Sequence, residues 1–116
     1  MAASLTPWMQ TVTLTVVNHA YQLSDLISQS GPDAPLVPAS GVYRAQYLAL
    51  HSDDENAGAR IFVGNSKVSS VNKGVTLFAT QVWPIYSMEG NLIRLDQIFV
   101  STDIAGAKLN VTFITR

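Results

Sequence analysis

Residues 10–17 read Gln-Thr-Val-Thr-Leu-Thr-Val-Val, so that Val12, Leu14 and Val16 alternate with threonines. A period of two in β-branched residues is typical of a β-strand with one buried side and one solvent-facing side. This is the clearest local pattern in the chain, and it predicts a fold built from strands.

Six further segments have the composition of short strands, and turn residues such as Gly, Asn and Asp separate them. They cover residues 42–51, 60–63, 75–79, 82–86, 92–101 and 108–114. Pro84 cannot donate a ladder hydrogen bond, so the segment that contains it is predicted to be an edge strand or a bulge. The apolar phase shifts between Leu95 and Ile98, which predicts a bulge at Asp96-Gln97.

Alternation also predicts which side chains are buried in two of these segments. In 42–51, Tyr47 and Ala49 fall on one face while Leu48 and Leu50 fall on the other, so both faces are expected to be partly covered. In 108–114, the side chains expected to face inward are Leu109, Val111 and Phe113.

One segment has a helical period instead. Within residues 22–29, Leu23, Leu26 and Ile27 stand at positions i, i+3 and i+4, and the Ser-Gly-Pro sequence at 30–32 ends the predicted helix. The prolines that follow predict an extended, proline-rich surface loop up to residue 41. They are Pro32, Pro35 and Pro38.

The fold class follows from this order of elements. Seven or eight short strands, one short helix and no βα alternation predict an all-β protein, a single antiparallel β-sandwich or jelly-roll-like domain. We expect this domain to span residues 10–116, with residues 1–9 forming a flexible N-terminal arm. A chain of 116 residues is long enough for one hydrophobic core.

The composition excludes several classes of protein. Apolar residues make up 47% of the chain and charged residues only 13%, which excludes intrinsic disorder. There is no Cys, and the net charge is −1, so we expect neither thiolate chemistry nor electrostatic capture of nucleic acid or a membrane. Polar residues are mostly amides and hydroxyls, which suit close packing against another protein because buried charges are costly to desolvate.

The ionisable residues predict no enzyme. Asp53, Asp54 and Glu55 are a candidate divalent-cation site, but the pattern of a calcium loop is absent, and we interpret them as a solvated acidic turn. His19 and His51 stand in neither a zinc spacing nor a nucleophile motif. We therefore expect no catalytic residue, no cofactor and no bound metal.

Two other features are considered as ligand sites, one for phosphate and one for carbohydrate. The sequence Gly-Asn-Ser-Lys at 64–67 has neither the spacing nor the following helix of a phosphate-binding loop, and it predicts a hairpin turn. Most aromatic residues lie within strands and are predicted to be core. Trp83 and Tyr86, beside Pro84, are the pair best suited to form an exposed carbohydrate platform.

The second part of the chain, about residues 42–116, resembles a known family through its order of strands and turns. The segments that carry the resemblance are Arg60-Ile61-Phe62-Val63-Gly64, Val68-Ser69-Ser70, Lys73-Gly74-Val75-Thr76-Leu77, Asn91-Leu92, Gln97-Ile98-Phe99-Val100-Ser101 and Asn110-Val111-Thr112-Phe113. The family is the small β-rich capsid decoration, or cement, proteins of tailed double-stranded DNA bacteriophages. The segment 31–42 has no counterpart in that pattern.

The resemblance implies a non-enzymatic virion protein on the capsid exterior. Such proteins sit as homotrimers at three-fold points and bridge neighbouring major capsid subunits, so the expected partner is the major capsid protein. Arms and loops are adaptable contact elements, and we expect those of this chain to bind the partner. The residues concerned are Leu5, Pro7, Trp8, Pro32, Pro35 and Pro38.

Two other functions are compatible with the same sequence. One is a receptor- or glycan-binding module of a tail or fibre, which would use exposed aromatic residues and the acidic turn with calcium. The other is a head–tail connector or tail component assembled as a larger ring.

Overall fold

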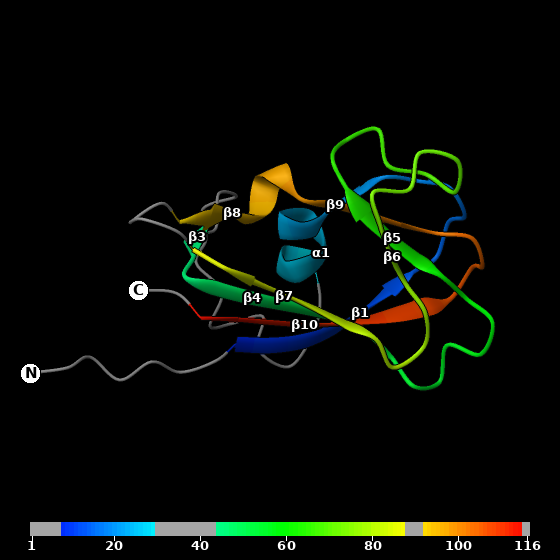
Figure 1. Ribbon diagram of the computed structural model, residues 1–116, viewed down its shortest axis with the longest axis horizontal. Coiled ribbons are helices and arrows are strands. Elements are labelled where there is room, and N and C mark those ends of the chain that lie inside the picture. The colour runs from blue at the N-terminus through cyan, green and yellow to red at the C-terminus, as the bar shows by residue number, and fades with distance from the viewer. Residues whose placement is uncertain (1–7, 30–43, 88–91, 115–116) are drawn as a thin grey trace, which may run out of the picture.

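The computed structural model describes residues 8–29, 44–87 and 92–114 (Figure 1). They form two antiparallel four-stranded sheets, which confirms the predicted all-β class. The long sheet has the order β1 (Trp8–Leu14), β10 (Ala107–Ile114), β4 (Tyr47–Ser52), β7 (Val82–Tyr86). The short sheet has the order β2 (Tyr21–Gln22), β9 (Phe99–Thr102), β5 (Ile61–Gly64), β6 (Val75–Leu77).

Three smaller elements complete the described fold. A short ribbon pairs β3 (Arg44–Ala45) with β8 (Ile93–Arg94), and a 3-10 turn, η2 (Leu95–Gln97), follows β8 directly. The predicted helix is confirmed as α1 (Leu23–Gln29). Figure 1 shows α1 beside the short sheet, where the two together cover one side of the long sheet.

Strand pairing is nested. β1 pairs with β10, β2 with β9, β3 with β8, β4 with β7 and β5 with β6, all antiparallel. Two further ladders, β10 with β4 and β5 with β9, join neighbouring pairs into the two sheets. The chain therefore behaves as one long hairpin that is rolled up so that its arms lie side by side.

Four short loops connect the two sheets at one end of the molecule, which we call the loop end. They are residues 15–20, 53–60, 78–81 and 103–106. Arg60 N–H donates to the carboxylate of Asp103 and so joins two of the loops. Asn18 N–H donates to Thr102 O at the end of β9, and Thr80 N–H donates to Ser52 O at the end of β4. Each of these bonds holds a loop to the neighbouring loop or to the strand end beside it.

The core lies between the sheets and under α1. The expected inward side chains of β10 are confirmed, because Leu109, Val111 and Phe113 are buried to 1% exposure or less. In β4 the buried side chains are Leu48, Leu50 and Ser52, and the opposite face is only partly covered. From α1, the residues buried in this core are Leu23, Leu26 and Ile27.

Several element boundaries differ from those expected. β1 begins at Trp8, so residues 8 and 9 of the predicted arm belong to the sheet, and it ends at Leu14 because the chain must turn there to reach the short sheet. The segment 42–51 divides into β3 and β4 at Gln46, whose N–H donates to Ile114. Residues 1–7 lie outside the described residues, as does the proline-rich stretch 31–41.

The segment 92–101 also differs from the prediction. In place of a bulge, η2 separates β8 from β9, and these two strands pair with different partners. The predicted edge position of Pro84 is confirmed, since β7 ends the long sheet. A proline at a sheet edge leaves no ladder donor missing and discourages pairing with another chain.

The loop before β7 contains a strained residue. Thr80 is exposed and adopts φ = 71°. The left-handed region costs a β-branched residue about 1–2 kcal/mol. The hydrogen bond from Thr80 N–H to Ser52 O, 2.9 Å long, holds this conformation.

We predict that Thr80→Gly raises the free energy of unfolding by about 0.5–1 kcal/mol, because relief of the strain exceeds the added entropy of glycine in the unfolded chain. Urea denaturation measures the change. Thr13→Gly, an exposed threonine within β1, is the matched control and is expected to lower stability. A Thr80→Gly variant no more stable than the parent chain would contradict the strain argument.

Candidate protein-interaction surface

The outward side of the long sheet, here called the outer face, is nearly free of charge. Its side chains alternate with the buried ones along each strand. They are Met9, Thr11 and Thr13 of β1, Lys108, Asn110, Thr112 and Ile114 of β10, Tyr47, Ala49 and His51 of β4, and Val82, Pro84 and Tyr86 of β7. Lys108 is the only Lys, Arg, Asp or Glu among them.

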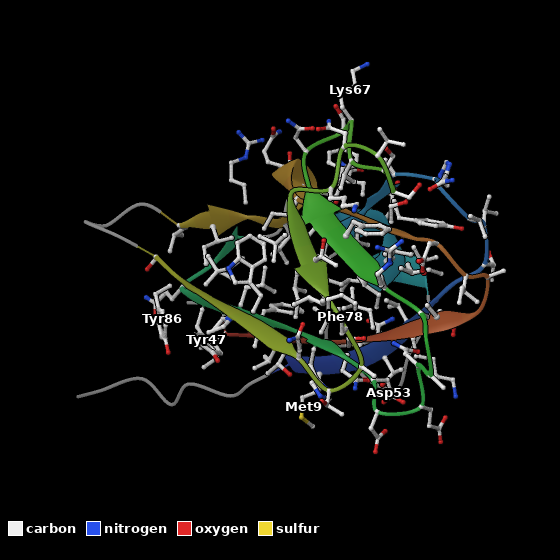
Figure 2. All side chains as sticks on the ribbon, turned by 45° about the vertical axis from the view of Figure 1, so that its right-hand side comes forward. Met9, Tyr47, Asp53, Lys67, Phe78 and Tyr86 are labelled. Carbon is white, nitrogen blue, oxygen red and sulfur yellow. The ribbon has the colours of Figure 1, made fainter. Side chains whose placement is uncertain are left out.

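The apolar part of the outer face, with Tyr86, Tyr47 and Met9, lies away from the loop end. Tyr86 is 66% exposed and Met9 58%. Val82, 53% exposed, begins β7 directly after the loop 78–81 and therefore lies near the loop end. The rings of Tyr47 and Tyr86 lie 5.0 Å apart at an interplanar angle of 54°. Figure 2 shows Met9, Tyr47 and Tyr86 on one side of the molecule and Lys67 on the opposite side.

The size of the outer face follows from sheet geometry. Four strands about 4.8 Å apart, each with about 20 Å of its length in the sheet, give a surface roughly 15 Å by 20 Å before the side chains are added. Such a surface is large enough to form the centre of a protein interface, and most of its side chains are uncharged, so that burial needs hydrogen-bond partners for them but no paired charges.

A polar network fixes the outer face near the loop end. The Thr11 hydroxyl donates to Oδ1 of Asn110 at 2.7 Å. The amide nitrogen of Asn110 donates to Oδ1 of Asp53 at 3.0 Å and lies 3.0 Å from Nδ1 of His51. Asn110 thereby links β1, β4 and the turn that follows β4, and its amide is satisfied on both sides.

Asp53 and Glu55 of the acidic turn are bonded to other groups of the same chain. The amide of Asn110, and then the backbone N–H of Glu55, hold the pKa of Asp53 below its ordinary value. Glu55 pairs with Lys108 at 3.0 Å. In the part of the chain that the structure describes, no three His, Cys, Asp or Glu side chains come together in a way that could hold a metal ion. The structure thus gives Asp53 and Glu55 local partners and leaves Asp54 exposed.

Of the predicted partner-binding residues, the structure describes only the backbone of Trp8. The backbone of Trp8 pairs with Phe113 at the start of β1. The other five residues, Leu5, Pro7, Pro32, Pro35 and Pro38, lie outside the described residues, and their role stays a prediction.

The predicted aromatic platform is not formed. Trp83 faces the opposite side of β7 from Tyr86 and packs against the core. The neighbour of Tyr86 is Tyr47, which lies directly across the ladder on β4. The sequence pointed to Tyr86 as a candidate exposed residue but paired it with Trp83. Tyr47 was missed because strand aromatics were predicted to be core, although the alternation of β4 puts Tyr47 on the face opposite Leu48 and Leu50.

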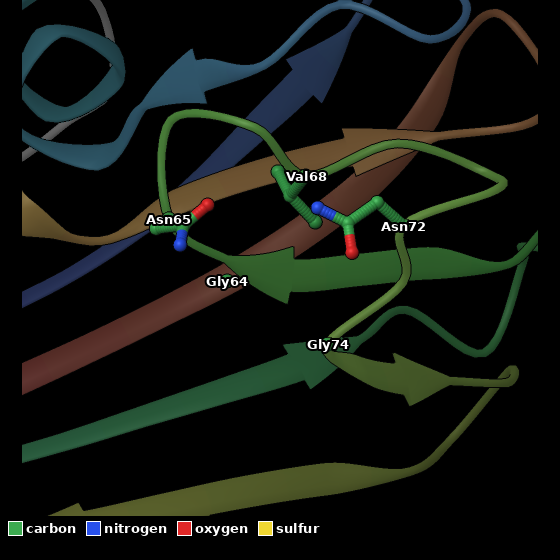
Figure 3. Close-up of a pocket in the computed structure, with 5 residues that line it drawn as sticks. All are labelled: Gly64, Asn65, Val68, Asn72 and Gly74. Carbon is green, nitrogen blue, oxygen red and sulfur yellow. The ribbon is translucent and has the colours of Figure 1, made fainter.

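A shallow hollow of about 110 Å³ lies beside the loop between β5 and β6 (Figure 3). Its lining consists of Gly64, Asn65, Val68, Asn72 and Gly74. The loop is held by its own side chains, since Asn65 accepts from Lys67 N–H and Asn72 donates to the Lys67 carbonyl. No charged side chain lines the hollow, which does not favour a phosphate site.

No family model, no curated protein and no solved structure matches this chain. Within the described residues, no helix has the length and apolar character needed to cross a membrane.

We predict that Asn110→Ala moves the carboxylate titration of Asp53 upward, toward the ordinary value of about 3.9. A lowered pKa in the folded state stabilises the protein above pH 4, and this contribution is lost as the pH falls through the folded value. The variant should therefore lose less stability than the parent chain between pH 5 and pH 2.

Carboxylate NMR titration and urea denaturation across this pH range provide the two measurements. Thr112→Ala, also outward on β10, is the matched control and should leave the Asp53 titration unchanged. An unshifted Asp53 midpoint in Asn110→Ala would show that the amide is not the cause.

Proposed function

We propose that this chain is a non-enzymatic structural protein of a virion, a capsid decoration protein that binds the outer surface of the shell and bridges major capsid subunits. The observation that carries the proposal is the outer face of the long sheet. It is almost uncharged, and it exposes Met9 on one edge strand, β1, and Val82 and Tyr86 on the other, β7. Such a surface suits stable contact with another protein.

The strand order supports a jelly-roll topology for the domain. Nested pairs rolled into two sheets, with the first strand beside the last, describe a hairpin wound around itself. Viral capsid proteins and lectins both use this architecture. Because one fold serves many functions, the topology is compatible with a virion role but is not the evidence for it.

In the proposed mechanism, the outer face is buried against the shell without burying an unpaired charged side chain. Burial of an unpaired charged side chain costs several kcal/mol. Alanine has no such cost, and the hydroxyls of threonine and tyrosine can be buried at a smaller cost when the partner supplies a hydrogen bond. The one lysine on the outer face is paired with Glu55 and stands at the loop end, outside the apolar part. A standard interface buries about 800 Å² on each partner, and the outer face can supply the central part of that area.

A homotrimer would strengthen this attachment. Three copies held in one body place three outer faces on the shell together, and the second and third contacts form at high effective concentration. A contact that is weak in one copy then becomes lasting on the capsid exterior.

The glycan-binding alternative is less well supported by the same face. Sugar rings stack on exposed aromatic faces, but the rings of Tyr47 and Tyr86 are tilted by 54° and pack on each other. They offer no pair of coplanar rings. Within the described residues the acidic turn also lacks a metal-binding group that calcium could use.

We predict that Val82→Asp and Tyr86→Asp each weaken binding to the shell by at least about tenfold, because each buries an unpaired charge. Co-sedimentation with empty phage shells that lack their decoration protein measures the binding. Val71→Asp is the matched control, since Val71 is 91% exposed on the β5–β6 loop. Full binding by both outer-face variants, with their melting temperatures unchanged, would overturn the assignment of this face.

The contribution of the N-terminal arm to binding is tested by deleting residues 1–7, not the whole predicted arm 1–9. Because β1 begins at Trp8, removing residues 1–7 leaves the sheet complete, whereas removing 1–9 shortens β1 by two residues. We predict that the 1–7 deletion keeps the melting temperature and weakens shell binding in the same sedimentation assay. Undiminished binding would show that the arm is not an anchor.

A further inference from the structure

Two tyrosine rings meet across the outermost ladder of the long sheet. Tyr47 of β4 and Tyr86 of β7 lie directly opposite each other in the register, and their ring centroids are 5.0 Å apart at an interplanar angle of 54°. Figure 2 shows the two side chains next to each other on the outer face. Tyr86 is 66% exposed and Tyr47 is half-buried, so small solutes reach the pair from water.

The backbone pairing brings these two side chains as close together as a ladder allows. Ser87 N–H donates to Gln46 O at 2.8 Å, which makes residues 46 and 87 a hydrogen-bonded pair. In an antiparallel ladder, hydrogen-bonded pairs alternate with non-hydrogen-bonded ones. Tyr47 and Tyr86 are one position further along, so they form a non-hydrogen-bonded pair, the kind in which opposite side chains lie closest.

The strands that carry the two rings are fixed on both sides. Gln46 N–H donates to Ile114 O at 2.8 Å and holds the start of β4 to β10, while the bond from Ser87 holds the end of β7 to β4. Tyr47 and Tyr86 therefore cannot separate without breaking backbone hydrogen bonds. Small rotations of the side chains within their rotamers are enough to change how the ring edges meet.

We propose that Tyr47 and Tyr86 are a site of oxidative cross-linking, where a peroxidase and hydrogen peroxide join the two rings as dityrosine. Each phenol loses one electron and one proton, and the two phenoxyl radicals form a carbon–carbon bond between the ring carbons beside their hydroxyl groups. Each ring becomes aromatic again when the hydrogen on that carbon moves to the oxygen. The pair loses two hydrogen atoms in all, and one molecule of peroxide is reduced to two molecules of water.

Proximity favours coupling within this pair over coupling between molecules. Groups that are held side by side react at an effective concentration far above that of separate molecules in solution. Tyr21, the remaining tyrosine that the structure describes, is engaged elsewhere. Its hydroxyl accepts from Val16 N–H at 2.9 Å, and its ring packs edge-on against His19.

The cross-link fastens the edge strand β7 to the rest of the long sheet. A covalent bond between residues 47 and 86 restricts the unfolded chain in the way that a disulfide does. We expect the cross-linked chain to melt at least about 5 °C above the untreated chain. The inference is independent of the proposed function, because its test needs only the free protein.

Treatment of the full chain in dilute solution with a peroxidase and hydrogen peroxide tests the inference. We expect dityrosine fluorescence in a chain that remains a monomer on a denaturing gel, and a proteolytic digest in which the peptides of Tyr47 and Tyr86 are joined with the loss of two hydrogen atoms. Tyr47→Phe and Tyr86→Phe should each lower the yield of this product at least about tenfold. Tyr21→Phe, which removes a hydroxyl but leaves the pair intact, is the matched control and should give the yield of the parent chain.

Circular dichroism melting establishes that each variant is folded. Absence of dityrosine overturns the inference, as does dityrosine found only in covalent dimers or a yield that Tyr86→Phe leaves unchanged. A joined peptide that contains another tyrosine in place of Tyr47 or Tyr86 also overturns it. A cross-linked chain that melts no higher than the untreated chain would refute the fastening of β7.

Discussion

The register of β10 between β1 and β4 is the constraint on which the rest of the described structure depends. β10 pairs with both neighbours, so its side chains alternate between the core and the outer face with no freedom to slide. A slip of one residue would turn Leu109, Val111 and Phe113 toward water, at about 2 kcal/mol each. The total, roughly 6 kcal/mol, is comparable with the whole stability of a small domain.

The same alternation creates the candidate interaction surface. Because the inward side chains of β10 are buried, Asn110 and Thr112 must face outward, level with His51 and Ala49 of β4. Asn110 then meets Thr11, His51 and Asp53, and the network it forms fixes the end of the face nearest the loops. The interaction surface and the core are thus two results of one pairing register.

At the loop end, short loops determine which side chains are exposed. Four short loops cross between the sheets there, and hydrogen bonds hold them to one another or to the neighbouring strand ends. Val16, Val17 and Ile104 are exposed in these loops, at the opposite end of the long sheet from Tyr47 and Tyr86.

The sequence by itself determined the strand-rich class, the helix at 22–29, the edge position of Pro84 and the inward set of β10, because each depends on a local period or on the chemistry of one residue. It did not determine the strand order, the outward position of Tyr47 or its pairing with Tyr86. It also did not predict that Trp8 begins β1 or that η2 replaces a bulge. Only the tertiary structure decided these points, since pairing between distant segments selects which face of a strand is covered and where a strand must end.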